Sequence, residues 1–219
     1  MLETPAAPLT SPIVVPIRSL GPLHRERIGA HLRELDPDDR YLRFGYMATD
    51  EQIDRYVAGL DFERDEIFGI YNRRLVLIAM AHLAFSPDPE HRACAEFGVS
   101  VVKKARGRGY GARLFERAAI HARNEGVDLM FIHALSENSA MLHIARTHGA
   151  TLERSGSETD AYLRLPPATL DSRISEIVEE QLARTDYHLK LQARSFGAFL
   201  AGLRDVRRSV REGRHRPAG

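Results

Sequence analysis

The chain has 219 residues and a formal net charge of +1 at pH 7; 43% of its residues are hydrophobic and 28% are charged. These values are ordinary for a soluble globular protein of one domain with an appendage, and the near-neutral charge gives no reason to expect a nucleic-acid or membrane partner. Its one cysteine, Cys94, excludes an internal disulfide framework. No apolar run reaches the roughly 18 residues of a membrane span, and the first residues lack a signal-peptide pattern, so we expect a cytoplasmic protein.

The beginning of the chain predicts a tail followed by a strand. Residues 1–11 contain proline and few large apolar side chains, so we expect a flexible tail before a domain that spans residues 12–165. Residues 13–17 are mostly branched apolar residues, which favours a strand. Because Pro16 cannot donate a ladder hydrogen bond, this strand is expected at an edge of the sheet.

Two helices are predicted next. Residues 21–35 carry an apolar stripe at helical spacing, and Thr49 precedes a second helix as its N-cap, with acidic residues in the first turn. Between them, residues 36–39 predict a turn. Residues 40–44 predict a loop whose aromatic side chains close the core.

A hairpin follows, with strands at residues 66–71 and 75–85 around a short polar connection. Both faces of the second strand are apolar, so we expect it to be covered on both sides. His82 lies in this row, and we interpret it as a hydrogen-bonded core or interface histidine.

The most informative stretch is a strand, a glycine-rich turn and a helix. Phe97, Val99 and Val101 alternate with smaller or polar residues, as in a half-buried strand. The turn has the sequence Arg-Gly-Arg-Gly-Tyr-Gly over residues 106–111, and residues 114–122 then show helical periodicity. Glycine permits positive φ and close backbone approach, while a helix start presents unpaired N–H groups and partial positive charge. The stretch therefore predicts a site for a phosphate or pyrophosphate.

Two well-known phosphate motifs can be compared with this turn. A P-loop would require Gly-Lys-Ser/Thr, which is absent. A dinucleotide-binding turn is closer, because Gly107, Gly109 and Ala112 fit its alanine variant and Glu137 could be the ribose acid. That fold, however, normally has several further strand–helix units after the turn, and here a single helix–strand–helix stretch follows.

The remaining domain elements are a strand at residues 128–134, parallel to the preceding strand because a helix joins them, and a helix at residues 138–148 that ends at a glycine. A closing antiparallel pair follows at residues 150–153 and 161–165. Residues 166–219 then predict a helical extension that ends in an arginine-rich segment. The helix carries an apolar stripe, so we expect the extension to be a dimerisation or docking arm.

Together these motifs resemble the GNAT superfamily of N-acetyltransferases, with some similarity to bacterial protein-lysine acetyltransferase domains. The signature Arg/Gln-x-x-Gly-x-Gly/Ala is matched by Arg106, Gly109 and Gly111, and the helix led by Asn138 resembles the family's next helix. The resemblance implies an α/β fold of the α+β type. Its mixed, mostly antiparallel sheet would contain a splayed parallel strand pair, flanked by helices and followed by the C-terminal extension.

The resemblance also implies acetyl-CoA as cosubstrate and a site for it. The turn would hold the pyrophosphate, and the pantetheine arm would lie in the gap between the two parallel strands, where a backbone N–H polarises the thioester oxygen. The expected cofactor-binding residues are Val99, Val101, Arg106, Gly107, Arg108, Gly109, Tyr110, Gly111 and Asn138. Asn138 could equally be a helix cap. The histidines show no ligand spacing, so no metal is predicted.

Glu96 is the predicted general base, because a glutamate in this place of the strand is typical of the protein-lysine acetyltransferases that the chain resembles. A lysine amine has a reference pKa near 10.4 and must lose a proton before it attacks. Many family members also have a tyrosine in the Asn-led helix that protonates the leaving thiolate. Here Ala145 occupies that place, which leaves water, Ser136, Ser139 or His143.

The predicted function is acetyl transfer from acetyl-CoA to a primary amine, either a protein lysine or a small molecule, with a homodimer formed through the C-terminal helix. The missing tyrosine and the long extension motivate an alternative, a non-catalytic CoA-binding sensor or scaffold. A less favoured alternative is an NAD(P)-binding oxidoreductase.

Overall fold

The computed structural model describes residues 15–86, 93–188 and 190–191. The N-terminal tail, the start of the predicted first strand and the arginine-rich end lie outside these residues. The elements in chain order are β1 (Arg18–Ser19), η1 (Pro22–His24), α1 (Arg25–Arg33), α2 (Pro37–Phe44), α3 (Asp50–Ala58), β2 (Glu66–Tyr71), β3 (Leu77–Phe85), β4 (Cys94–Val101), η3 (Lys103–Ala105), α4 (Tyr110–Asn124), β5 (Leu129–Leu135), α5 (Ser139–Thr147), β6 (Thr151–Ser155) and β7 (Glu158–Arg164). Residues 170–188 form a further helix, called here the C-terminal helix.

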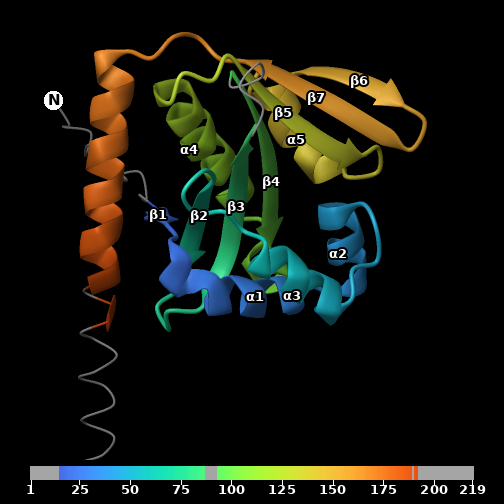
Figure 1. Ribbon diagram of the computed structural model, residues 1–219, viewed down its shortest axis with the longest axis horizontal. Helices are drawn as coiled ribbons and strands as arrows, with labels where there is room; N and C mark the ends of the chain where they lie inside the picture. The colour runs from blue at the N-terminus through green and yellow to red at the C-terminus, as the bar shows by residue number, and fades with distance from the viewer. Residues whose placement is uncertain (1–14, 87–92, 189, 192–219) are drawn as a thin grey trace, which may run out of the picture.

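The described strands form one seven-stranded sheet in the order β1-β2-β3-β4-β5-β7-β6 (Figure 1). Neighbouring strands are antiparallel except for β4 and β5, which are parallel because α4 carries the chain back between them. The predicted mixed, mostly antiparallel sheet with flanking helices is confirmed. A doubly wound sheet, on which the dinucleotide interpretation depends, is not what this chain forms.

The parallel pair is short, and this shapes the site. β4 pairs with β5 from Cys94–Glu96 against Leu129–Phe131. Beyond that point β4 stays paired with β3 as far as Val101, while β5 stays paired with β7 as far as Leu135. The two strands therefore separate after Glu96 and Phe131, and this splayed region is called the fork below.

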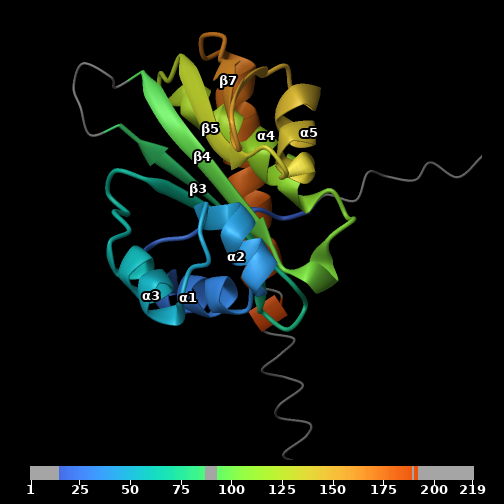
Figure 2. The same cartoon turned by 90° about the vertical axis from the view of Figure 1, so that its right-hand side faces the viewer.

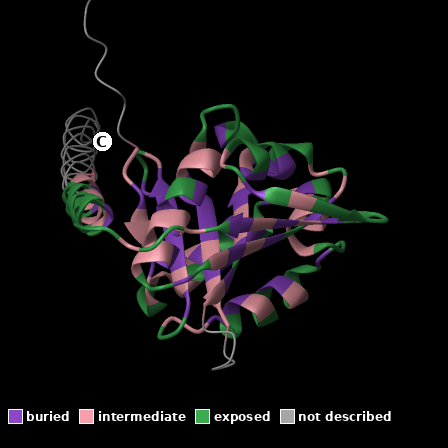
Figure 3. Ribbon diagram, turned by 90° about the horizontal axis from the view of Figure 1, so that it is seen from above, coloured by how far each residue is buried: buried purple, intermediate pink, exposed green. Residues whose placement is uncertain are grey.

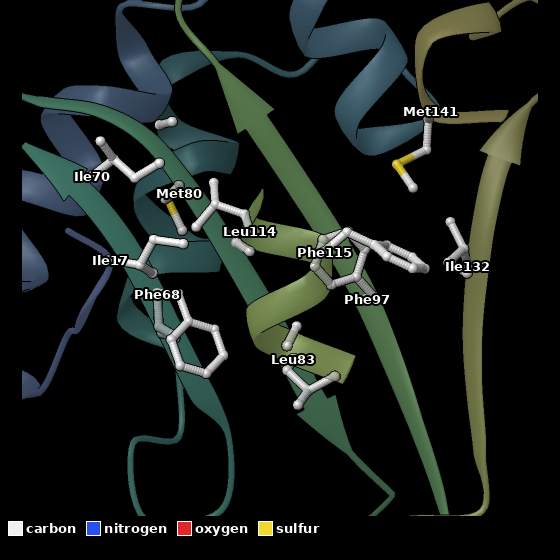
Figure 4. Packing of buried hydrophobic residues seen from close by; sticks show 14 of the residues in the cluster. Ile17, Phe68, Ile70, Met80, Leu83, Phe97, Leu114, Phe115, Ile132 and Met141 are labelled. Atoms are coloured by element: carbon white, nitrogen blue, oxygen red, sulfur yellow. The ribbon is translucent and has the colours of Figure 1, made fainter. Parts of the chain in front are cut away.

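Helices cover both faces of the sheet (Figure 2). α1, α2 and α3 lie on one face, and α4 and α5 lie on the other. The core beneath α4 is built around Phe97 of β4, whose ring meets that of Phe115 edge to face at 5.1 Å. Leu83, Leu114 and Ile132 are fully buried around this pair (Figure 4). Close packing of these side chains fixes the position of α4, and hence of the turn that precedes it.

Two local predictions are wrong. Residues 36–44 are not a turn and loop but contain α2, because the Asp36 carboxylate accepts a hydrogen bond from the N–H of Asp39 at 2.9 Å and Pro37 takes the first helical position. Gly45 ends the helix with φ +78°. The first strand is also displaced: residues 15–17 lie outside any strand, and β1 is Arg18–Ser19. Its predicted edge position is confirmed.

The C-terminal helix stands beside α4 at the β1 edge of the sheet (Figure 1). Thr169 caps it as predicted, because its Oγ1 accepts a hydrogen bond from the N–H of Ser172 at 3.2 Å. Much of its outer surface is exposed (Figure 3). In the part of the chain that the structure describes, no helix is both long and apolar enough to cross a membrane.

Candidate active site

A cavity of about 530 Å³ opens at the fork. Its walls come from α2, the end of β4, the glycine-rich turn, the start of α4 and the start of α5. All of the predicted cofactor-binding residues except Arg108 line it, namely Val99, Val101, Arg106, Gly107, Gly109, Tyr110, Gly111 and Asn138. Residues from separate parts of the chain are thus brought into one wall.

The turn at the base of this cavity has the backbone expected of an anion site. Gly107 and Gly109 both have φ +73°, a conformation that favours glycine, and Gly109 is the N-cap of α4. The N–H of Arg113 donates the first bond of the helix to the carbonyl of Gly109 at 3.1 Å. The N–H groups of residues 110–112 precede that bond and have no partner in the helix, so they can bind an anion.

The two arginines of the turn differ from the prediction in what they contact. Arg106 forms an ion pair with Asp39 of α2 and donates from Nε to the carbonyl of Val101 at 3.2 Å. It therefore fastens α2 to the turn. Arg108 is exposed and lies outside the cavity lining. Within the turn, the backbone N–H groups of residues 110–112 are therefore the donors left for an anion.

Asn138 joins two walls of the cavity. Its Oδ1 accepts from the N–H of Met141 at 3.1 Å, which caps α5, and its Nδ2 donates to the carbonyl of Leu42 in α2 at 3.4 Å. The helix-cap alternative is therefore observed. Contact with the pantetheine arm stays a prediction, supported by the position of Asn138 in the cavity lining.

Glu96 lies at the last paired position of the fork. Its side chain is exposed and lines a second hollow of about 490 Å³, together with Phe85 and Phe131, instead of the larger cavity. Side chains alternate along a strand, so Glu96 shares its face of β4 with Gly98, on the side covered by α1–α3. This places the carboxylate beside the fork and open to solvent.

The structure also reveals a polar chain that the sequence did not suggest. Arg43 donates from Nη2 to the hydroxyl of Tyr56 at 3.0 Å, and this hydroxyl is 2.7 Å from Nδ1 of His82. Nε2 of His82 is 3.1 Å from Asp65, which in turn accepts from Arg64 at 2.8 Å. The prediction of a hydrogen-bonded His82 is confirmed. The chain itself has no sequence signal, since its members come from separate elements with no fixed spacing.

The charges along this polar chain determine its proton positions. Burial would raise the pKa of Asp65, but hydrogen bonds from Arg64 and His82 outweigh it and lower that pKa, so Asp65 is a carboxylate. Burial, assisted by the charge of Arg43, lowers the pKa of His82 despite the bond to Asp65. Neutral His82 therefore donates from Nε2 to Asp65 and accepts at Nδ1 from Tyr56, whose pKa burial raises. The hydroxyl oxygen of Tyr56 remains the acceptor for Arg43.

The residues considered for protonating the leaving thiolate differ in whether they line the large cavity. Ala145 is fully buried in the core. Ser136 shares a hydrogen bond of 2.8 Å with Thr159, and of the residues considered His143 is the one that lines the large cavity.

Among the described residues, no group of three or more His, Cys, Asp or Glu side chains could hold a metal ion.

Comparisons with known proteins agree with this geometry. Residues 31–150 match the model of the acetyltransferase (GNAT) family. No curated protein sequence matches the chain at a significant level. Among solved structures, the GNAT domain of S. lividans PAT is 19% identical, with a TM-score of 0.59 over 68% of this chain and 89% of that one.

A putative acetyltransferase from Salmonella typhimurium, solved with its cofactor acetyl-CoA, is 15% identical with a TM-score of 0.55, over 71% of this chain and 96% of that one. A putative phosphinothricin N-acetyltransferase is 17% identical with a TM-score of 0.57, over 70% of this chain and 99% of that one. At such identities these structures show a shared fold. With the family match over more than half of its length, the chain belongs to the GNAT family of N-acetyltransferases, which use acetyl-CoA.

Proposed function

We propose that this protein transfers the acetyl group of acetyl-CoA to a primary amine by direct attack of the amine on the thioester. The observation that carries the proposal is the cavity at the fork, which ends at the N-terminus of α4 with three N–H groups free of helix partners. A pyrophosphate matches this arrangement in charge and in hydrogen-bonding capacity.

The residues of the cavity fit the rest of acetyl-CoA. Past Glu96, the edge of β4 that faces β5 is not paired with any of the described strands, so its backbone groups can bond to the amides of a pantetheine arm. Val99 and Val101 supply apolar wall beside that edge, and Asn138 supplies a polar group. One backbone N–H at the fork would polarise the thioester oxygen.

Glu96 is the proposed general base. A primary amine is protonated at neutral pH and needs an acceptor for its proton before it can attack. The carboxylate of Glu96 is exposed at the head of the fork, within the hollow next to the cavity, and can take the proton directly or through a water molecule. Since Ala145 has no donor group, the thiolate would leave with a proton from solvent or from His143.

A non-catalytic CoA-binding sensor or scaffold is the second candidate. Two observations favour it: Ala145 is buried where the family's tyrosine is expected, and Glu96 lines a hollow separate from the cofactor cavity. This alternative predicts that acetyl-CoA binds but that no amine releases CoA from it.

The test combines binding and turnover. Acetyl-CoA, and not NAD(P)H, should raise the melting temperature; a ligand at 100 times its Kd adds about 2.7 kcal/mol to stability. Free CoA should then appear with members of an amine panel. Glu96→Gln should retain the thermal shift and lose about 10²-fold or more in kcat, while Glu153→Gln, an exposed residue of β6, serves as the matched control. Normal turnover in Glu96→Gln would reject the base.

We further propose a homodimer formed through the C-terminal helix, and a cytoplasmic location. The helix is attached to the body by polar residues such as Glu176, which accepts from Arg117 at 2.7 Å. Four of its apolar residues lie on the opposite side and are exposed: Leu170, Ile174, Ile177 and Val178. An exposed apolar stripe on a helix complements a second copy of itself.

Light scattering would test the dimer. The wild-type chain should have twice the protomer mass, and Ile174→Asp combined with Ile177→Asp, both at exposed positions, should give the protomer mass with an unchanged circular dichroism spectrum. Glu153→Lys, on a distant exposed strand, should leave the dimer intact. A wild-type mass equal to one protomer at micromolar concentration would rule the arrangement out.

A further inference from the structure

Arg43 occupies a specific place in the wall of the large cavity. Its guanidinium lies flat against β4 at Gly98. A Cβ atom built on Gly98 would come within 2.8 Å of Cζ and Nη2 of Arg43 and within 2.9 Å of Nη1. Real side-chain contacts are not this short, so the absence of a side chain at residue 98 is what allows the guanidinium to lie there.

The polar chain described above holds this guanidinium in one orientation. Each link has a defined donor: Arg43 to Tyr56, Tyr56 to His82, and His82 to the carboxylate of Asp65. The rings of Phe44 and Tyr56 lie 5.2 and 5.6 Å from Cζ of Arg43 and add cation–π attraction. A side chain held by such a series of contacts is pre-organised for binding.

The charge of Arg43 is not neutralised by an adjacent carboxylate. Within residues 15–86 and 93–188, no Asp or Glu oxygen lies within the 4.0 Å of an ion pair, and its one hydrogen bond uses a single N–H of five. Arg106 lines the same cavity but is paired with Asp39. Arg43 therefore presents free donors and a positive charge, which a carboxylate accepts in a bidentate geometry.

The distance to the proposed base limits the kind of ligand. Gly98 follows Glu96 by two residues on the same face of β4, a separation of about 7 Å along the strand. Burial raises the pKa of Tyr56 and lowers that of His82, and the negative charge of Glu96 makes a smaller upward contribution to both, so it lies near these two side chains. A small molecule with an ammonium near Glu96 and an anion on Arg43 spans this separation.

We propose that Arg43 binds a carboxylate of the acceptor, so that the acceptor is a small amino acid, with a primary amine and a carboxylate separated by only a few bonds. This inference rests on the proposed acetyl transfer and specifies its substrate class. The side chain of a lysine within a protein lacks this carboxylate and gains nothing from Arg43. Tyr56, His82 and Asp65 act as positioning residues, because they reach the substrate through Arg43.

Matched substrate pairs test the proposal. Release of CoA is followed with amino acids and with the corresponding decarboxylated amines, which differ only in the carboxylate. A charge-assisted pair of hydrogen bonds should give the best amino acid an advantage of about 10- to 100-fold in kcat/KM. Arg43→Met should bring this ratio towards 1, and Tyr56→Phe should lower it partly. Arg55→Met, at an exposed position of α3, is the matched control and should keep the wild-type ratio.

Several outcomes would overturn the assignment: no preference for the carboxylate in the wild-type protein, a preference that survives in Arg43→Met, or faster acetylation of lysine peptides than of every amino acid. A calorimetric titration of the amino acids into CoA-saturated protein separates this inference from the proposed function. Binding that is lost in Arg43→Met supports the carboxylate site even if no amine releases CoA, a result that would contradict acetyl transfer alone. If none of the amino acids binds or reacts, the carboxylate site is wrong.

Discussion

Arg117 and Arg43 are two arginines in similar settings with different partners. Each guanidinium lies near an aromatic ring, with Cζ of Arg117 4.9 Å from the centroid of Phe68 and that of Arg43 5.2 Å from Phe44. Arg117, on α4, is 3% exposed and faces three glutamates of the C-terminal helix at 2.7, 3.7 and 3.8 Å. Arg43 reaches its carboxylate through two intervening side chains.

The comparison shows how one residue type serves either structure or binding. The glutamates neutralise Arg117 where it is buried, so its charge attaches the C-terminal helix to the body and is not available to a ligand. Burial would raise the pKa of Glu176, but hydrogen bonds from His121, Asn124 and Arg117 lower it to about 2. Arg43, in contrast, is held by neutral groups and keeps its charge for the cavity.

Removing each arginine should therefore affect different properties, and the largest effect on stability is expected at Arg117. Arg117→Ala leaves the glutamates without their buried cation, and breaking such a pair costs about 3–5 kcal/mol. Urea unfolding monitored by circular dichroism measures this loss. Arg146→Ala, at an exposed position of α5, should change stability by less than about 0.5 kcal/mol. A loss below about 1 kcal/mol in Arg117→Ala would contradict the structural role.

Acid should act on two sets of buried groups in different pH ranges: the histidines His82 and His31, and Glu176 beside Arg117. Burial lowers the pKa of His82, and it lowers that of His31 to about 4. Both are neutral in the folded protein, so their stabilisation is complete above pH 6.5 and decreases as the pH falls towards the folded pKa. For His31 the loss by pH 4 is about 3 kcal/mol. Glu176 also loses its stabilising contribution as the pH falls, but at lower pH: the contribution is complete above pH 4.5 and decreases towards pH 2.

Unfolding free energies between pH 7 and 3 measure this difference. Glu176→Gln should flatten the pH dependence below about 4.5 and leave the slope between 6.5 and 4.5 unchanged. His31→Gln should flatten the pH dependence between 6.5 and 4.5 and leave the lower part unchanged. This variant removes the buried imidazole that lies 3.1 Å from the carbonyl of Leu77 and 2.8 Å from Ser100. The same pH profile in both variants would mean that these groups do not control acid stability.

The smallest expected effect is at the link between Arg43 and His82. Tyr56→Phe removes one hydroxyl and two hydrogen bonds but no apolar packing, so stability should fall by about 1 kcal/mol. Differential scanning calorimetry would detect the change, with Tyr162→Phe on β7 as the control. If Tyr56→Phe has no effect on stability or on the acceptor preference, the polar chain does not position Arg43.

Much of the fold was predictable because local signals and long-range packing agree. The period of Phe97, Val99 and Val101, the cap at Thr49 and the glycines of the turn each predicted the element observed. α2 was missed because polar and aromatic residues dominate residues 36–44, although Asp36, Pro37 and Gly45 together were a readable capping signal.

The site was only partly predictable. The turn is local in sequence, so its residues could be found by motif. The pairing of Arg106 with Asp39, and the chain from Arg43 to Asp65, depend on how separate helices dock on the sheet. No spacing rule contains that information, and the separation of Glu96 from the large cavity is likewise a property of the docked structure.

The fork also has a consequence for how the sheet exchanges its amide hydrogens with solvent. Ladder hydrogen bonds protect amides, and β3 is paired on both sides while the fork edges of β4 and β5 are not paired with each other beyond Glu96 and Phe131. Amides on those edges should exchange early in the free protein. A cosubstrate bonded to them would slow their exchange, so the backbone of β4 would itself report occupancy of the cavity without any label.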